Sequence, residues 1–181
     1  MRRKPSGVRL PETENLKVKE STFVKGELGV STKRAYRKGE LLFKVEGPIR
    51  PYPTKYSFSV ALDQHIEPQR EDGVSDFGHY LNHSCNPNVI ARPMGAGTET
   101  PYIEVIARHD IRAGEEMAFD YASLEYEVTV ANAACKCSAL TCRRVIHGFK
   151  NLPTDVVEKY MAEGMVPDYL LQLHKIKPRQ D

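Results

Sequence analysis

The stretch Asn82-His83-Ser84-Cys85-Asn86-Pro87-Asn88 decides the fold together with two stretches further along the chain. One is Gly114-Glu115-Glu116-Met117-Ala118-Phe119-Asp120-Tyr121, and the other is Cys135-Lys136-Cys137, followed after four residues by Cys142. All 4 cysteines of the protein lie in these stretches. Four thiolates form a closed tetrahedral shell for a structural zinc ion. With Cys85 as the fourth ligand, the metal would hold the C-terminal cysteines against the upstream loop.

The cysteines have other uses that the sequence leaves open. They could form two disulfides in a secreted chain, a C-x-C pair can be redox-active, and a buried thiol can serve packing alone. The basic start Met1-Arg2-Arg3-Lys4 is followed by Pro5-Ser6-Gly7 and not by an apolar signal segment. This favours thiolate–metal binding in an intracellular, reducing compartment, without distinguishing nucleus from cytoplasm.

Composition indicates a soluble globular protein. The chain has 181 residues, of which 40% are hydrophobic and 28% charged, enough for one domain with appendages. The net charge is +2, but the basic excess lies at the two ends, and residues 23–142 are net −3. A mildly acidic body suits a cationic peptide better than a phosphate backbone. We therefore expect no direct nucleic-acid binding, no membrane span and a monomer.

Patterning divides the chain into short strands followed by helices. Residues 1–20 are rich in Pro, Lys and Glu, which predicts a flexible N-terminal arm. Residues 63–78 and 93–101 are predicted to be mostly loop and turn. Two helices are predicted after Pro153 and Pro167, with Gly164 ending the first. Short strands are predicted at 22–24, 29–32, 41–45, 56–62, 102–107 and 117–119.

The motifs and their order resemble the SET-domain protein lysine methyltransferases that carry a C-terminal post-SET zinc segment, in their compact stand-alone form. The resemblance implies a mostly β fold with short helices (α+β), a β-clip of small curved sheets. In it, the chain after Tyr121 passes under the Asn82–Asn88 loop in a knot-like arrangement. It further implies a SET domain over 21–126, a post-SET zinc segment over 127–147 and a helical tail over 148–181. The zinc ligands would be Cys85, Cys135, Cys137 and Cys142.

The resemblance also implies site residues. Tyr121 matches the catalytic tyrosine, and Asn82 and His83 match the pair that holds the adenosine end of S-adenosylmethionine. His79 stands where many relatives have an arginine that touches this cofactor. Glu27-Leu28-Gly29 stands where the family has Gly-x-Gly, with Glu27 replacing the first glycine. The pocket tyrosine expected near Phe43 is missing, so Phe43, Tyr52 or Tyr56 would line the channel instead.

These matches predict an S-adenosylmethionine-dependent protein-lysine N-methyltransferase. Its substrate would be a lysine in a protein or peptide, with a histone tail as one possible class. Phe119 fits the position that sets how many methyl groups are added, and phenylalanine there predicts di- or trimethylation. The altered glycines leave a second hypothesis, a catalytically silent domain that binds a peptide or methyl-lysine. A small zinc protein that binds nucleic acid is a third, which lacks the expected basic and aromatic stripe.

Overall fold

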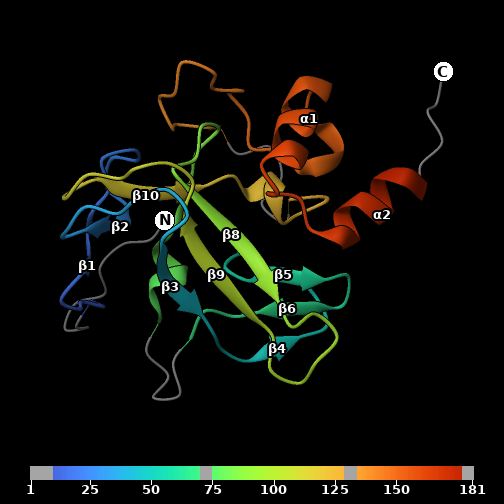
Figure 1. Ribbon diagram of the computed structural model, residues 1–181, viewed down its shortest axis with the longest axis horizontal. Coiled ribbons are helices and arrows are strands. Elements are labelled where there is room, and N and C mark those ends of the chain that lie inside the picture. The colour runs from blue at the N-terminus through green and yellow to red at the C-terminus, as the bar shows by residue number, and fades with distance from the viewer. Residues whose placement is uncertain (1–9, 70–74, 129–133, 177–181) are drawn as a thin grey trace.

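The computed structural model describes residues 10–69, 75–128 and 134–176. Within them the strands form three small sheets, which Figure 1 shows around the diagonal pair β8 and β9. One sheet has the order β1-β2-β10-β7, the second β3-β9-β8 and the third β4-β6-β5. The strands are β1 Leu16–Glu20, β2 Leu28–Thr32, β3 Leu41–Val45, β4 Ile49–Arg50, β5 Phe58–Ala61, β6 Gln64–Ile66, β7 Asn82–His83, β8 Val89–Met94, β9 Tyr102–Ala107 and β10 Glu116–Phe119.

The helices are short and most follow the last strand. Three are 3-10 turns: η1 Phe77–Tyr80, η2 Tyr121–Ser123 and η3 Phe149–Asn151. The α-helices are α1 Thr154–Ala162 and α2 Asp168–Ile176, so the two helices predicted after Pro153 and Pro167 are confirmed. Gly164 adopts a φ of +64°, which suits a glycine just beyond a helix end. None of the described helices is both long and apolar enough to cross a bilayer.

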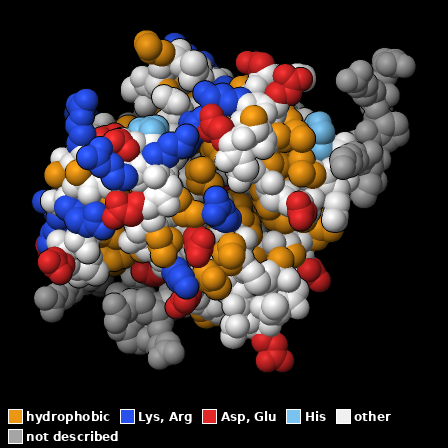
Figure 2. Space-filling model, viewed as in Figure 1, with side chains coloured by type: hydrophobic (Ala, Val, Ile, Leu, Met, Phe, Trp, Pro, Cys, Tyr) orange, Lys and Arg blue, Asp and Glu red, His pale blue; other side chains and the backbone are white. Residues whose placement is uncertain are grey.

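The arm predicted over residues 1–20 is wrong for its last five residues. Leu16–Glu20 is β1 and pairs antiparallel with β2 along its full length. Leu16 and Val18 are buried while Lys17 and Lys19 point outward, an alternation that the charged composition obscured. Residues 1–9 lie outside the described residues. In Figure 2, basic side chains gather on the side of the molecule where Figure 1 shows β1 and β2, interspersed with acidic ones.

Three local predictions were also wrong. Residues 22–24 form a turn, because the Ser21 hydroxyl accepts from the backbone N–H groups of Phe23 and Val24 and removes them from strand pairing. The predicted loop 63–78 contains β6, and β8 runs into the predicted turn at 93–101 as far as Met94. Pro93 contributed to the prediction of a turn. In the structure Pro93 pairs with Ile103, because β8 is the edge strand of its sheet and an edge strand accommodates a residue without a backbone N–H.

β10 lies at the centre of the part that matters for function. It pairs antiparallel with β2 on one side and parallel with β7 on the other. The Asn88 side chain adds two bonds to β10, accepting from the Ala118 N–H at 2.9 Å and donating to the Glu116 carbonyl at 2.8 Å. The Asn82–Asn88 loop is thus bonded along β10. This contact brings two of the three motifs together, as the resemblance implied.

The core is continuous beneath the sheets, and the helical tail packs on it through small clusters. Val30, Val45, Ile103 and Met117 are fully buried at the centre. The tail contributes two groups, Tyr160 and Met165 packed on Ile90, and Phe149, Val157 and Leu170 packed together. Burial of this apolar surface holds the tail against the β-rich body.

Candidate active site

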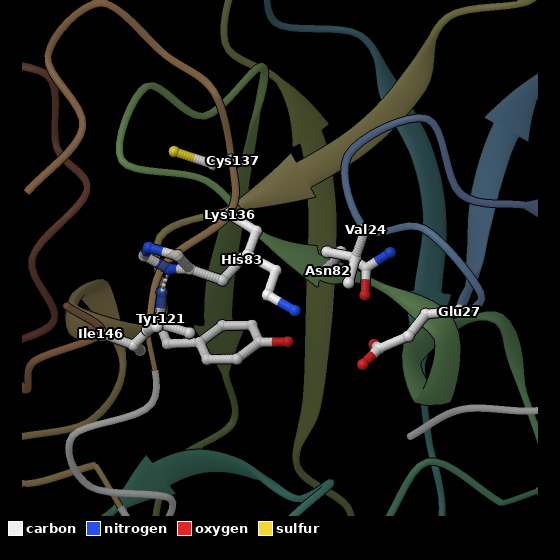
Figure 3. A pocket seen from close by; sticks show the side chains of 9 residues that line it. Val24, Glu27, Asn82, His83, Tyr121, Lys136, Cys137 and Ile146 are labelled. Atoms are coloured by element: carbon white, nitrogen blue, oxygen red, sulfur yellow. Dashed lines mark hydrogen bonds between the residues drawn. The ribbon is translucent and has the colours of Figure 1, made fainter. Parts of the chain in front are cut away.

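A cavity of about 360 Å³ lies where the three motifs meet. Its volume falls within the range of small-ligand and cofactor sites, roughly 300–1,000 Å³. We call Val24 and Glu27 its N-terminal wall, and Asn82, His83 and Tyr121 its floor. Its C-terminal wall consists of Ala134, Lys136, Cys137 and Ile146. Figure 3 shows the Glu27 carboxylate on one side of this space, and the Lys136 amine and the Tyr121 hydroxyl on the other.

The N-terminal wall is held by a buried carboxylate, Glu116, which is 3% exposed at the start of β10. Its Oε1 accepts from Ser21 Oγ at 2.8 Å, and its Oε2 accepts from the backbone N–H and the hydroxyl of Thr22. The same Ser21 hydroxyl caps the turn that leads to Val24. Because a buried carboxylate needs such donors, Glu116 fixes the 21–27 loop on β10.

Gly29 is a glycine because Glu116 lies against it. A Cβ at this position would meet Glu116 Oε1 at 2.1 Å and Asn82 Nδ2 at 3.1 Å. The resemblance implied a cofactor contact at Gly29, and this stays a prediction. In the structure Gly29 makes room for the carboxylate that supports the wall, and it is not among the described residues that line the cavity.

On the floor, Asn82 is oriented by three acceptors. Its Nδ2 lies 2.9 Å from Glu116 Oε1, 3.0 Å from the Leu28 carbonyl and 3.2 Å from Ser21 Oγ. Asn82 therefore joins the floor to the N-terminal wall. Leu28 takes part through this carbonyl, while its side chain is buried in the core.

His83 lies between Tyr121 and the cysteines. Its Nδ1 is 3.3 Å from the Tyr121 backbone N–H, which donates to it, and its Nε2 is 3.3 Å from Cys85 Sγ. Burial lowers the pKa of His83 to about 4, so the ring is neutral near pH 7. A neutral ring accepting at Nδ1 carries its proton on Nε2, directed at the Cys85 sulfur.

The Tyr121 hydroxyl contacts a backbone carbonyl that the fold supplies. It donates to the Leu81 carbonyl at 3.1 Å, and its ring lies edge-on to His83 with centroids 5.2 Å apart. Because the proton is given to Leu81, the hydroxyl oxygen can act as an acceptor toward the cavity. Tyr121 shares this cavity with Asn82, as the sequence predicted.

The four cysteines come together beside the C-terminal wall. Their sulfur atoms all lie within 4.8 Å of one another, and Cys85 and Cys135 are 3.7 Å apart. Tetrahedral zinc with Zn–S bonds of about 2.3 Å separates its sulfurs by about 3.8 Å, so the set fits this ion. Backbone N–H groups of Arg143 and Arg144 point at the sulfurs of Cys85 and Cys142, both at 3.4 Å.

Burial and backbone contacts change the acidity of these thiols. Burial raises the pKa of Cys85 to about 11 and raises that of Cys135 as well. For Cys137, burial acts in the same direction, but hydrogen bonds from backbone N–H groups outweigh it and lower the pKa to about 7. Because a metal binds the thiolate form, zinc binding at neutral pH would release protons from Cys85 and Cys135. Four sulfur donors at these separations match a closed structural zinc site.

The remaining predicted residues lie elsewhere. The His79 ring packs on Tyr56, with centroids 4.1 Å apart, and His79 does not line the cavity in the described part of the chain. Phe119 is 6% exposed, and its ring lies between Phe58 at 5.2 Å and Tyr121 at 5.0 Å. Phe119 thus borders Tyr121 from behind the cavity. Tyr52 is 57% exposed.

Sequence reasoning missed five residues at the site. Val24, Ala134, Lys136 and Ile146 line the cavity, and Glu116 supports it. Lys136 alone had an available signal, because its neighbours Cys135 and Cys137 were assigned as ligands. The three apolar residues carry no chemical signal that separates them from ordinary packing residues.

Taken together, the fold and the site define a β-rich domain with a cavity floored by Tyr121 and closed by a segment whose three cysteines cluster with Cys85. A family model described as SET domain matches residues 27–122. The chain therefore belongs to the SET-domain family.

Curated relatives resemble part of the chain. It is 30% identical over 104 residues to histone-lysine N-methyltransferase Su(var)3-9 of Drosophila pseudoobscura pseudoobscura, covering 50% of this chain and 16% of that protein. It is 28% identical over 145 residues to histone-lysine N-methyltransferase SUV39H2 of Bos taurus, covering 71% and 34%. The chain thus spans about a third or less of the length of these relatives.

Solved structures confirm the predicted β-rich fold of small sheets. The structure of KRYPTONITE in complex with mCHG DNA and SAH superposes with a TM-score of 0.59 and 24% identity, covering 74% of this chain and 29% of that one. The methyltransferase domain of human histone-lysine N-methyltransferase SETMAR gives 0.57 and 20%, covering 74% and 58%. At these identities the likeness concerns the fold.

Proposed function

We propose that this protein is an S-adenosylmethionine-dependent protein-lysine N-methyltransferase. The observation that carries the proposal is the single cavity shared by Tyr121, Asn82 and the zinc segment residue Lys136. Family membership and the names of the relatives support it. When bound, the cofactor would supply a methyl group already activated on a sulfonium.

The charges at the cavity suit this cofactor. Its amino-acid end carries an ammonium and a carboxylate, and the cavity offers Glu27 and Lys136 on opposite sides. These groups could pair with the two charges of that end. KRYPTONITE was crystallised with SAH, the product form of the same cofactor, which supports the assignment.

The substrate lysine must lose its proton before it can accept a methyl group. Its solution pKa is about 10.4. An apolar, aromatic surround lowers that pKa by desolvation, and the Tyr121 ring in the cavity, backed by the buried rings of Phe119 and Phe58, supplies one side of such a surround. The Tyr121 oxygen, whose proton is held by Leu81, can accept a hydrogen bond from the amine and align it. Tyr121 thus acts first through orientation and electrostatics.

Zinc would be held by the four cysteines and would have a structural role. A closed thiolate shell leaves no open position for chemistry. Cys137 both belongs to the cluster and lines the cavity, so the ion would fix the C-terminal wall. Thiolate ligands require a reducing compartment, which supports an intracellular location.

Phe119 supports the addition of more than one methyl group. Its ring packs on Phe58 and Tyr121 and brings no hydroxyl that could hold a water beside the amine. We therefore infer a di- or trimethylating enzyme. Mass spectrometry of a modified peptide after long incubation tests this. Accumulation of only the monomethyl form would overturn it, and Phe119→Tyr is expected to shift the product toward monomethyl-lysine.

The proposed activity is tested by transfer of labelled methyl from S-adenosylmethionine to purified histones and ribosomal proteins. Tyr121→Phe should lower the rate by about 10²-fold, because it removes the aligning oxygen. Tyr102→Phe, which alters a tyrosine on β9, is the matched control and should leave the rate unchanged. A histone H3 tail is a reasonable first substrate, since KRYPTONITE was also crystallised with an H3(1–15) peptide.

The same experiment tests the second hypothesis, a silent peptide-binding domain. The replacement of the first glycine by Glu27 favours it, because the cofactor wall departs there from the pattern of the family. Cofactor or peptide binding without methyl transfer to any protein in the screen would establish that alternative and exclude the enzyme.

A further inference from the structure

Asp120 is a completely buried carboxylate that the proposed reaction does not use. It is 0% exposed and lies between Phe119 and Tyr121 in the chain. Its Oδ1 accepts from the Ala122 N–H at 3.1 Å and thereby caps η2, the turn that contains Tyr121. The Tyr121 N–H in turn donates to His83. The orientation of the Asp120 carboxylate therefore affects where the Tyr121 backbone lies.

Arg143 of the zinc segment neutralises Asp120 but does not fix its orientation. The contact runs through one nitrogen, Nη2, which is 2.8 Å from Oδ1 and 2.7 Å from Oδ2. Arg143 Nε is buried and has no hydrogen-bond partner in the described part of the chain. A two-pronged guanidinium–carboxylate pair would set the plane of the carboxylate. A contact through one nitrogen leaves that plane free to rotate.

A second hydrogen bond that orients the Asp120 carboxylate comes from the helical tail. Tyr160 in α1 is 2% exposed, and its hydroxyl donates to Asp120 Oδ2 at 2.7 Å. Burial, followed by the charge of Asp120, raises the pKa of Tyr160 well above its ordinary value, so the hydroxyl keeps its proton. The two carboxylate oxygens thus receive donors from different segments, Oδ1 from the η2 turn and Oδ2 from α1.

The rest of α1 is held rigidly enough to serve this purpose. Tyr160 packs in a cluster with Ile90 of β8 and Met165. Just after the helix, Glu163 accepts two bonds from Arg108, at 2.6 and 3.1 Å. The Arg108 guanidinium also lies over the Tyr160 ring, 5.7 Å from its centroid. These contacts with β8 and with Arg108 fix α1, and with it the Tyr160 hydroxyl, against the sheet.

We propose that Tyr160 is a positioning residue for methyl transfer: through Asp120 it sets the placement of Tyr121, so the helical tail is part of the active site. This inference rests on the proposed function. Tyr160 is not among the described residues that line the cavity. Its effect should appear in the rate of the chemical step, since small displacements of an aligning group cost rate more than affinity.

The first test is Tyr160→Phe in the full-length, zinc-loaded protein. It removes one hydroxyl and keeps the ring in its cluster. We expect kcat to fall about tenfold, with the KM for S-adenosylmethionine changing by less than about twofold. Tyr36→Phe is the matched control, because Tyr36 is also 2% exposed but packs under Arg34 and pairs with Ile111, outside this network. The control should keep the kcat of the parent protein.

A double-mutant cycle distinguishes positioning from general loosening of the structure. In an Asp120→Asn background, adding Tyr160→Phe should change kcat by less than about twofold, because the path through the carboxylate is already broken. Independent, multiplicative effects would overturn the inference, as would a kcat of Tyr160→Phe equal to that of the parent. If the parent protein itself transfers no methyl group to any substrate, the proposed function fails instead, and the two results are read from the same assay.

Discussion

Glu116 and Asp120 are two buried carboxylates four residues apart, and they support opposite walls of one cavity in different ways. Glu116 is bonded by neutral donors, including Ser21 and Asn82. Asp120 is bonded by a charged group, Arg143, and by the distant Tyr160. The N-terminal wall therefore depends on close fit, and the C-terminal wall depends on charge and on the metal. Both carboxylates belong to the same segment of chain, β10 and the residue that follows it, so we expect substitutions there to disturb both walls.

Removal of zinc should have the largest effect, because it should disrupt the C-terminal wall and leave the N-terminal wall in place. Structural zinc contributes about 10 kcal/mol or more to folding in small thiolate peptides. Chelation should abolish measurable cofactor binding and expose the amides of residues 134–146 to hydrogen exchange, while those of β1 and β2 stay protected. Binding should also weaken as pH falls, because protons compete for Cys85 and Cys135, whose pKa values are raised. Equal exchange in β1, β2 and residues 134–146 would contradict the independence of the walls.

Removing each charge without changing shape compares the two carboxylates directly. Asp120→Asn should destabilise the protein by about 3 kcal/mol, because Arg143 then remains buried without its counter-charge. Glu116→Gln should cost about 2 kcal/mol, because an amide N–H₂ then faces donors. Urea unfolding measures both. A loss of stability in Glu116→Gln equal to or larger than that in Asp120→Asn would show that the two carboxylates do not differ in this way.

Gly29→Ala should test the close fit of the N-terminal wall. The new Cβ would lie 2.1 Å from Glu116 Oε1, so the carboxylate would have to leave its donors. We expect a destabilisation of about 1–3 kcal/mol and weaker cofactor binding. Scanning calorimetry measures the change in stability, and titration calorimetry measures the change in cofactor affinity. Gly97→Ala is a control in which a Cβ meets no atom within 4 Å, although its positive φ carries a small cost of its own. Unchanged cofactor affinity in Gly29→Ala would argue against Glu116 as the support of this wall.

Glu163→Gln should have the smallest effect. The Arg108 hydrogen bond lowers the pKa of Glu163, whose side chain is 34% exposed and so partly screened by solvent. The contribution at pH 7 should therefore be below about 1 kcal/mol. Because the folded pKa lies below the unfolded value of about 4.3, this stability is present above that pH and is lost as pH falls through the folded pKa. The difference in stability between parent and variant should shrink steadily as pH falls below about 4, and a difference that stays constant there would contradict this assignment.

The residues that could be predicted from sequence are those in contiguous motifs. Asn82, His83 and Tyr121 line the cavity as expected, and the four cysteines cluster as expected, because each motif carries its own residue types and spacing. Leu28, Gly29 and His79 were placed by register with a resemblance, and they support or lie beside the cavity instead of lining it. A match in sequence position does not show which atoms of a residue face a cavity, because this depends on the elements packed around it.

The supporting contacts could not be predicted, because each joins segments far apart in the chain. Nothing local to Tyr160 indicates that its hydroxyl meets a carboxylate 40 residues earlier, and the helical pattern of 154–162 is equally satisfied by ordinary core packing. From the sequence, Glu116 is likewise typical of a solvated residue at the end of a strand. Only the structure shows that the hydroxyls of Ser21 and Thr22 donate to its carboxylate. Buried polar partners follow from topology and not from periodicity.

The central position of β10 has a consequence for how the protein is made. This strand pairs with β2, more than 80 residues earlier, and the carboxylate of Asp120 just after it accepts a hydrogen bond from Tyr160, 40 residues later. Contacts of such long sequence separation form slowly. During synthesis, the pocket can therefore close only after Ile146 of its C-terminal wall, and Tyr160 of α1 that bonds Asp120, have left the ribosome.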